Sequence, residues 1–501
     1  MGKDNFKKKV RLMLLKSNKS NFKWFMISYG MVIISYTIYV FSFNNIKISH
    51  SNELIIFFLS WIGVLLLAYI LITWKKVSGA YFHPYTIFIL FLFLFNYGQP
   101  LMWAFGIHDP NEIGKGITYS TIGVVGEVEI IKAQLIILVS IIMFHTGALF
   151  NLLFNKKDLM EYTEKEDNNI MQRAIFYVSI VFGLVSIPIT IMQAYNDWQL
   201  SSLYGYSSLY NSNSINQSSS IISLFIFMFF PSLLGLLIGS GYNKKVKMIV
   251  YSIFIIYFIF NFLAGDRGTW IYRLFIFAFL EHSLNKKFTK KTILTFTPIA
   301  VLGIYITDVV VGLRNKEINF NSVVESLSLD KMPVFSAFFE MGTSMNPTIV
   351  LIKNGWDMWP YQNTYFLAFF GMVSDKVFNI LGIPFAPLNS FFSREYLGIS
   401  WGAGFSIVAE ALLNYGPMLA PFLFIIIGFI VSKLVYIDTD IDFKKQPMTY
   451  FFALSTLDAI IAINRNSMHY SMKIWFYGVL LFSLIVLVIR NLLSLQKTKI
   501  N

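Results

Sequence analysis

The chain has 501 residues, of which 56% are hydrophobic and 18% aromatic, while only 13% carry a charge. Soluble domains are roughly a quarter charged, so this composition excludes an ordinary soluble protein and indicates a membrane protein. The absence of cysteine excludes disulfides, thiolate metal sites and cysteine nucleophiles. The net charge of +13 lies mostly in short segments beside apolar runs, a pattern that argues against nucleic acid as a partner.

Twelve apolar runs recur along the chain, each about the length of a helix that spans a hydrocarbon core of roughly 30 Å. The sequence therefore predicts an all-α polytopic membrane protein with about 12 transmembrane helices. The run after the basic N-terminus is too long for a signal peptide and lacks a small-residue cleavage site, so we expect a retained first helix. The runs cover 24–44, 53–74, 84–105, 130–154, 174–194, 219–240, 247–264, 268–284, 292–313, 406–435, 448–466 and 473–493.

The distribution of basic residues predicts the orientation of these helices. With the basic N-terminus inside, both termini are cytoplasmic, and the segments on that side, together with Arg490 at the inner end of the last run, hold 27 of the 40 Lys and Arg residues. Moving the register by one helix would invert this bias, which membrane proteins show as an excess of positive charge inside. We expect one membrane domain over residues 1–501, in which 314–404 is a large extracytoplasmic loop with short helices.

The arginines do not follow this orientation rule. A guanidinium is a planar, permanently charged fork that binds phosphate or carboxylate bidentately, whereas a lysine ammonium is a point charge. The arginines could instead cap helices or pair with acidic loop residues. Because five of eight oppose the rule together, we predict a shared anionic ligand on the outer face. These five are Arg267, Arg273, Arg314, Arg394 and Arg465.

The first polar constellation is the segment NFLAGDRGTWIYRLF, where two predicted helices meet outside. Asp266 and Arg267 lie between two glycines, and Gly268 precedes a helix whose N-terminus would face outward. Free backbone N–H groups and the helix dipole favour an anion there. Arg273 lies deeper in the membrane, where a charge must be paired or face a wet cavity. The alternative is a structural pair between Asp266 and an arginine.

The second constellation is SWGAGFSIVAEALLNYGPM, in which polar residues recur every four positions. Gly402, Ser406, Glu410 and Asn414 would share one helix face near the outer boundary of the membrane. A carboxylate at Glu410 could accept a proton from a hydroxyl nucleophile. It could instead neutralise a nearby arginine.

The third constellation is INRNSMHYSMK, between the last two predicted helices. Arg465 and His469 are four residues apart, the spacing of neighbours on a helix face. Histidine is suited to proton transfer near neutral pH, although a lone surface histidine is usually incidental. The Asp438-Thr-Asp440 sequence resembles a metal-binding motif but is predicted to be cytoplasmic, and the first outer loop has no acidic pair. We therefore predict no metal and no cofactor.

Three of these features together resemble the Wzy-type oligosaccharide repeat-unit polymerases. They are the outer GDRG turn, the late outer loop, and G-x-G-x-S-x-x-x-E-x-x-x-N-x-G from Gly402 to Gly416. The resemblance implies a multi-pass protein of the bacterial cytoplasmic (inner) membrane that polymerises undecaprenyl-pyrophosphate-linked oligosaccharides on the extracytoplasmic face. Its expected partners are these lipid-linked substrates, membrane lipid, a chain-length regulator and a flippase.

The resemblance also assigns roles to the polar residues. The five arginines would bind the pyrophosphate leaving group and stabilise it electrostatically. Glu410, or alternatively His469, would activate the acceptor hydroxyl, with Asp266, Gly268, Ser406 and Asn414 in support. A lipid-linked oligosaccharide flippase, a polysaccharide ligase and a proton-coupled transporter remain as alternatives. A flippase would place charges along a central cavity between two related halves, and a transporter would need mid-membrane carboxylates beyond Asp458.

Overall fold

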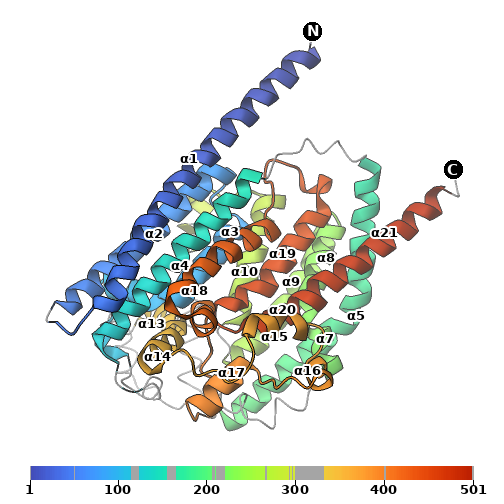
Figure 1. Ribbon diagram of the computed structural model, residues 1–501. Helices are drawn as coiled ribbons and strands as arrows, with labels where there is room; N and C mark the ends of the chain where they lie inside the picture. Colours follow the sequence, from blue (N-terminus) through green and yellow to red (C-terminus); the bar gives the residue numbers. More distant parts are fainter. Residues whose placement is uncertain are drawn as a thin grey trace. The chain divides into compact units, whose positions relative to one another are not determined.

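The computed structural model describes residues 2–49, 51–113, 123, 125–154, 165–205, 209, 220–265, 268–292, 294–295, 297–298, 332–399 and 402–498. Within these ranges the regular structure is helical and contains no strand, so the predicted all-α membrane fold is confirmed (Figure 1). Ten helices in this part of the chain are long and apolar enough to cross a membrane. They are Ser20–Asn45, Asn52–Ser78, Pro84–Ala104, Glu127–Phe154, Asp167–Tyr204, Ile222–Gly239, Lys244–Ala264, Ile407–Leu434, Pro447–Asn464 and Met468–Gln496.

Two of the twelve predicted runs have no counterpart among these ten. At 268–284 the structure has α10 (Thr269–Leu280), which continues as the π-helical turn η4 (Glu281–Asn285). Most of the run 292–313 lies outside the described residues, as do Asp266, Arg267 and Arg314. The described chain forms two units that interleave in sequence. Unit 1 contains 1–162, 341–360 and 406–439, and unit 2 contains 163–340, 361–405 and 440–501.

Unit 1 is built around two helices whose backbones touch, α4 and α18 (Figure 1). A Cβ atom at Gly147 would lie 2.0 Å from the carbonyl oxygen of Ile425, and one at Gly428 would lie 1.9 Å from that of Phe144. Glycines thus remove side chains where the two helices meet, which is how membrane helices approach closely. The elements of unit 1 are α1 (Gly2–Asn45), α2 (Asn52–Ser78), α3 (Pro84–Ala104), η1 (Pro110–Glu112), α4 (Glu127–Phe154), η5 (Gly342–Met345), α14 (Asn346–Asn354) and α18 (Ile407–Leu434).

Helix α18 is interrupted near its first third, and α1 stabilises the interruption. Gly416 has φ 68° and ψ 174°, which breaks the helix, and Pro417 follows directly. Because Pro421 has no N–H, the carbonyl of Pro417 lacks its usual helical donor. The hydroxyl of Tyr39 donates to that carbonyl at 2.8 Å, and the hydroxyl of Tyr36 donates to the carbonyl of Met418 at 3.0 Å.

Two buried histidines tie other parts of unit 1 together. His83 caps α3, because its Nδ1 accepts from the backbone N–H of Tyr85 and its Nε2 donates to the carbonyl of Ile437 at 3.0 Å. Burial lowers the pKa of His83 to about 4, so the ring is neutral. His145 lies between the hydroxyls of Thr73 and Tyr85, at 2.8 and 2.9 Å. Every ring nitrogen of both histidines therefore forms a hydrogen bond that holds the fold together.

Unit 2 is a second helical bundle in which α5 packs against α8, α9 and α21. Small residues again allow close approach, since a Cβ atom at Gly239 would lie 2.6 Å from the backbone nitrogen of Phe176. The elements of unit 2 are α5 (Lys165–Tyr204), α7 (Ser220–Phe227), α8 (Phe229–Gly239), α9 (Lys244–Ala264), α10, η4, α13 (Pro333–Met341, which ends at unit 1), α15 (Thr364–Gly371), α16 (Lys376–Leu381), α17 (Leu388–Ser390), η6 (Phe391–Tyr396), η7 (Phe443–Lys445), α19 (Pro447–Ile461), η8 (Ala462–Asn464), α20 (Met468–Trp475), η9 (Phe476–Leu481) and α21 (Phe482–Thr498).

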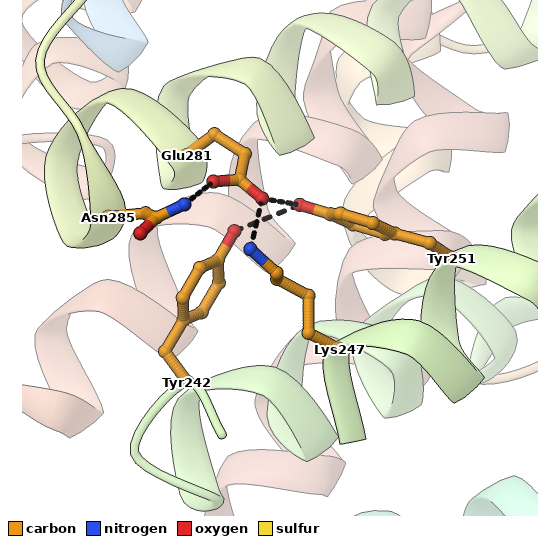
Figure 2. A network of polar contacts seen from close by, with 5 residues as sticks. All are labelled: Tyr242, Lys247, Tyr251, Glu281 and Asn285. Carbon is orange, nitrogen blue, oxygen red and sulfur yellow. Dashed lines mark hydrogen bonds and ion pairs between the residues drawn. The ribbon is translucent and has the colours of Figure 1, made fainter. Parts of the chain in front are cut away.

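A polar network centred on Glu281 joins α9 to the turn after α10 (Figure 2). Lys247 Nζ and the Tyr251 hydroxyl each lie 3.0 Å from Glu281 Oε1, and Asn285 donates to Oε2 at 2.7 Å. Tyr242 completes the network through its hydroxyl, 2.9 Å from that of Tyr251. Although desolvation opposes ionisation, these donors hold the pKa of Glu281 below its usual value. The carboxylate thus fixes the π-helical turn at this end of the bundle.

The predicted outer loop 314–404 is described from residue 332 onward, apart from 400 and 401. It contains only short elements there, α13, η5, α14, α15, α16, α17 and η6, none of them longer than nine residues. The prediction of one membrane domain and the predicted orientation of the chain stay predictions.

Candidate functional site

Three of the five predicted site arginines are described, and all three belong to unit 2. Arg273, on α10, is engaged by protein groups. Its Nε donates to Asp458 Oδ1 at 2.9 Å and its Nη1 donates to the Tyr257 hydroxyl at 2.8 Å. Its guanidinium carbon also lies within 6.0 Å of the ring centroids of four aromatic residues, Phe229, Phe230, Tyr257 and Tyr272. The carboxylate neutralises this buried charge, which matches the pairing alternative but with a different acid from Asp266.

Arg465 follows the short helix η8 at the end of α19, and its main chain is held firmly. Its carbonyl oxygen accepts from the backbone N–H of Phe405 at 3.0 Å. Gly404 has φ +70°, and a Cβ atom there would lie 3.4 Å from the same oxygen, so this approach favours glycine. The side chain is half-buried and forms no ion pair with any residue in the described ranges. Its fork is therefore available to an anion.

Arg394 lies in η6, on a segment bonded to the loop that holds Arg465. Asn389 donates to Asn466 Oδ1 at 2.9 Å, which ties the start of that segment to the residue after Arg465. The Ser393 hydroxyl accepts from the backbone N–H of Ala403 at 2.9 Å, two residues before the Phe405 bond. Residues 402–405 therefore contact both arginine-bearing segments.

The side chain of Arg394 is exposed, and the described part of the chain offers it no ion pair, its neighbour Glu395 included. Arg394 is therefore not paired with Glu395, its neighbour in the sequence. Two arginines with no acidic partner in the described structure carry their charges on segments that are bonded to one another.

His469 lies on α20, four residues after Arg465, beside an acid from the predicted outer loop. Its Nε2 is 2.9 Å from Asp375 Oδ1, and the ammonium of Lys473 pairs with the other oxygen of the same carboxylate. The ring N–H is not aligned on the oxygen, so this contact is an ion pair in distance more than a directed hydrogen bond. Desolvation would raise the pKa of Asp375, but its contacts with His469 and Lys473 outweigh this effect and lower the pKa.

The imidazole of His469 is closely packed, and its side chain is only 11% exposed. The ring of Phe385 lies 5.0 Å from it, centroid to centroid. A Cβ atom at Gly371 would lie 2.6 Å from Cε1, so α15 passes against the ring edge. Neither ring nitrogen meets the geometry of a hydrogen bond with a described residue, although Nε2 lies close to the Asp375 carboxylate.

Glu410, Ser406 and Asn414 lie together at the start of α18, in unit 1. The Ser406 hydroxyl caps the helix by accepting from the backbone N–H of Ala409 at 3.1 Å, and Asn414 donates to the carbonyl of Glu410 at 2.7 Å. The residue Glu410 is completely buried. Of the predicted helical face, Glu410 and Asn414 lie on α18 and Ser406 is its N-cap, whereas Gly402 lies before the helix begins. Ser406 and Asn414 act on the backbone around the carboxylate.

The sequence singled out Arg465 and His469 as candidates but not Asp375 and Lys473, the acid and the lysine that the structure places beside the histidine. The spacing of Lys473 four residues after His469 was a usable signal, whereas nothing local singled out Asp375. Gly268 is described as the residue before α10, while its neighbours Asp266 and Arg267 and the distant Arg314 lie outside the described residues. Over the described ranges, no three His, Asp or Glu side chains lie close enough together to hold a metal ion.

These observations define a multi-pass helical membrane protein that presents guanidinium, imidazole and carboxylate groups on short helices and the segments that join them. The family model for the O-antigen polysaccharide polymerase Wzy matches residues 24–497, nearly the whole chain, and the chain therefore belongs to this family. The family resemblance predicted from the sequence is thereby confirmed. No curated protein and no solved structure matches the chain.

Proposed function

We propose that the protein polymerises oligosaccharide repeat units carried on a lipid pyrophosphate, undecaprenyl pyrophosphate, at the extracytoplasmic face of the bacterial inner membrane. An acceptor sugar hydroxyl attacks the anomeric carbon of the donor, and the bond from that carbon to the phosphate oxygen breaks. The lipid pyrophosphate leaves with the bonding electrons, and the hydroxyl proton passes to a base on the protein. Family membership supports the polymerase, and the residues below support the finer steps.

The observation that carries this proposal is the availability of Arg465 and Arg394. Both guanidinium groups lack an acidic partner in the described structure, and main-chain and side-chain bonds link their segments. Two forked cations on linked loops suit a diphosphate, whose negative charge increases as the sugar bond breaks. Such stabilisation does not require a metal. Arg273, which Asp458 already neutralises, contributes less to this site.

His469 is the base that the geometry favours. It follows Arg465 by four residues, and because Asp375 lies 2.9 Å from its Nε2, Nδ1 is the nitrogen left to accept a proton. Catalytic hydrogen bonds often form only when substrate binds, so the lack of a hydrogen bond at Nδ1 does not argue against His469 as the base. Glu410 is the alternative base, in unit 1. A ligase of related architecture would use the same arginines and differ in its acceptor.

The experiment is polymerisation by the purified full chain in liposomes with a lipid-linked repeat unit, read as a ladder on a gel. Removing one preorganised donor to a developing oxyanion costs about 100-fold in rate, so we expect Arg465→Ala to lose that much. Arg465→Lys should recover part of it, because a charge returns without the fork. Arg173, an exposed arginine on α5, provides the matched control, and Arg173→Ala should polymerise normally. Normal ladders from Arg465→Ala would refute the pyrophosphate site.

A further inference from the structure

We propose that Asp375 is a positioning residue of this polymerase, which orients His469 and selects the tautomer in which Nδ1 is the proton acceptor. The inference rests on the proposed function and extends it by a carboxylate and a lysine. Asp375 lies at the start of a helix without capping it. Asp375 is the N-cap residue of α16, yet its side chain makes no capping bond. Aspartate at this position ordinarily caps the helix.

The carboxylate of Asp375 faces α20 instead. One oxygen lies 2.9 Å from His469 Nε2, and the other pairs with Lys473, one helical turn further along the same helix. The Asp375 loop is tied to the same region by Tyr477, whose hydroxyl donates to the carbonyl of Val373 at 2.6 Å. Contacts with His469 and Lys473 and a backbone bond thus determine where this carboxylate lies, although 40% of its side chain is exposed.

The position of the carboxylate decides the state of the ring. A neutral imidazole has one N–H and one bare nitrogen, and the proton resides where an acceptor stabilises it. Asp375 stabilises the proton on Nε2, which leaves Nδ1 as a bare acceptor. When Nδ1 takes a proton from the acceptor sugar, the ring becomes positive and the adjacent carboxylate stabilises it. This division of roles is that of the acid in a Ser-His-Asp triad.

Packing holds the ring in the orientation that the carboxylate requires. Phe385 lies beside the imidazole, and α15 passes against the ring edge at Gly371. Of the described charged groups, Asp375 lies against the ring and Lys473 lies against Asp375. The two have opposite effects, because the carboxylate favours the protonated ring and the ammonium opposes it. Removing the carboxylate and removing the ammonium should therefore shift the pH dependence of the reaction in opposite directions.

The test is the rate of polymerisation against pH, measured on the full chain in liposomes with lipid-linked repeat units. Asp375→Asn keeps the shape of the side chain and removes its charge. We expect the rate to fall about 10- to 100-fold, as when a group that orients a functional histidine is lost. We also expect the acidic limb of the profile to move to lower pH, since an opposite charge has been removed. Asp375→Glu should restore part of the rate.

Lys473→Met should move the same limb to higher pH, because it removes a positive charge and leaves the carboxylate in place. The matched control is Asp167→Asn, which removes another ion-paired carboxylate of unit 2, that of the Arg490 pair. It should leave the limb where it is. Size-exclusion profiles and melting temperatures show whether each variant is folded. If Asp375→Asn does not fold, Asp375→Glu is the variant that tests the proposal.

Three outcomes would overturn the inference. One is a normal rate with an unmoved limb in Asp375→Asn, and another is a limb that moves the same way in Asp375→Asn and Lys473→Met. The third is normal polymerisation by His469→Gln. In that case Asp375 would have no base to position, while the loss of activity in Arg465→Ala would still support the polymerase site.

Discussion

Arg273 and Asp458, separated by 185 positions in the sequence, form a buried ion pair that joins α10 to α19. The Asp458 side chain is 3% exposed and that of Arg273 15%. A charge so far from water must be neutralised by another group of the protein. The Tyr257 hydroxyl and nearby aromatic rings complete the surroundings of the guanidinium.

Removing one partner of this pair should destabilise the bundle more than removing both. Asp458→Asn leaves the guanidinium buried without a counter-charge, which typically costs about 3–5 kcal/mol. The Arg273→Met, Asp458→Leu double variant should recover much of that loss, because no uncompensated charge remains. Melting in detergent, followed by tryptophan fluorescence, provides the measurement. If Asp458→Asn melts like the wild type, some other group neutralises Arg273. A double variant that is stable but inactive would give Arg273 a role in substrate binding.

The contact between α4 and α18 should not tolerate even one methyl group. In Gly428→Ala the new Cβ atom would lie 1.9 Å from a backbone oxygen, which cannot move aside as a side-chain end can. We expect a loss of about 1–3 kcal/mol or more, seen as a lower melting temperature and a smaller monodisperse peak. Gly30→Ala on α1 is the control, because no atom lies within 4 Å of its added Cβ and alanine favours the helix. Equal stability of the two variants would show that the helices can separate.

His83 should make the protein less stable as the pH falls below neutral. Its pKa is about 4 when folded, below the unfolded value of about 6.5. The unfolded chain therefore binds the extra proton first. The contribution of the neutral ring is complete above pH 6.5 and is lost as the pH falls toward 4, with a limit of about 3 kcal/mol. Melting temperatures from pH 7.5 to 5 should fall less in His83→Gln than in the wild type. Parallel curves would assign the acid sensitivity to other groups.

Glu410→Gln should abolish long polymer and leave single lipid-linked units, since it removes the buried carboxyl group at the start of α18 with little change in side-chain volume. Gel ladders from cells that carry the variant provide the measurement, with Glu53→Gln, an exposed acid of α2, as the control. Unchanged chain lengths would remove Glu410 from the site. The residual rate against pH separates the two candidate bases, because loss of the acidic limb in Glu410→Gln would make Glu410 the base instead of His469.

The fold was largely predictable because hydropathy and charge act locally along the chain. A span needs about twenty apolar residues in sequence, and that requirement alone locates most of the helices. The same reasoning failed to anticipate that the run at 268–284 divides into α10 and a π-helical turn, because the Glu281 network that holds the turn comes from α9 and its preceding loop. Close contacts such as Gly147 on Ile425 were equally hidden, since glycine gives no hydropathy signal.

The site was predictable in its residue types and less so in its pairings. Arg465 and His469 could be found because they interrupt an apolar pattern four residues apart. Asp375 lies 94 residues before His469, within a loop of ordinary polarity, and nothing local distinguishes it from a surface acid. Asp458 was noticeable as an intramembrane carboxylate, but its partner on α10 becomes evident only when the two helices pack.

The tyrosine bonds from α1 to the interrupted part of α18 make α18 dependent on a helix that lies far from it in the sequence. Tyr36 and Tyr39 precede the carbonyls of Pro417 and Met418, to which they donate, by almost four hundred residues. A truncation or fusion that displaces the first helix would therefore disturb the chain near Glu410, far away in sequence. Tags are better attached at the other terminus.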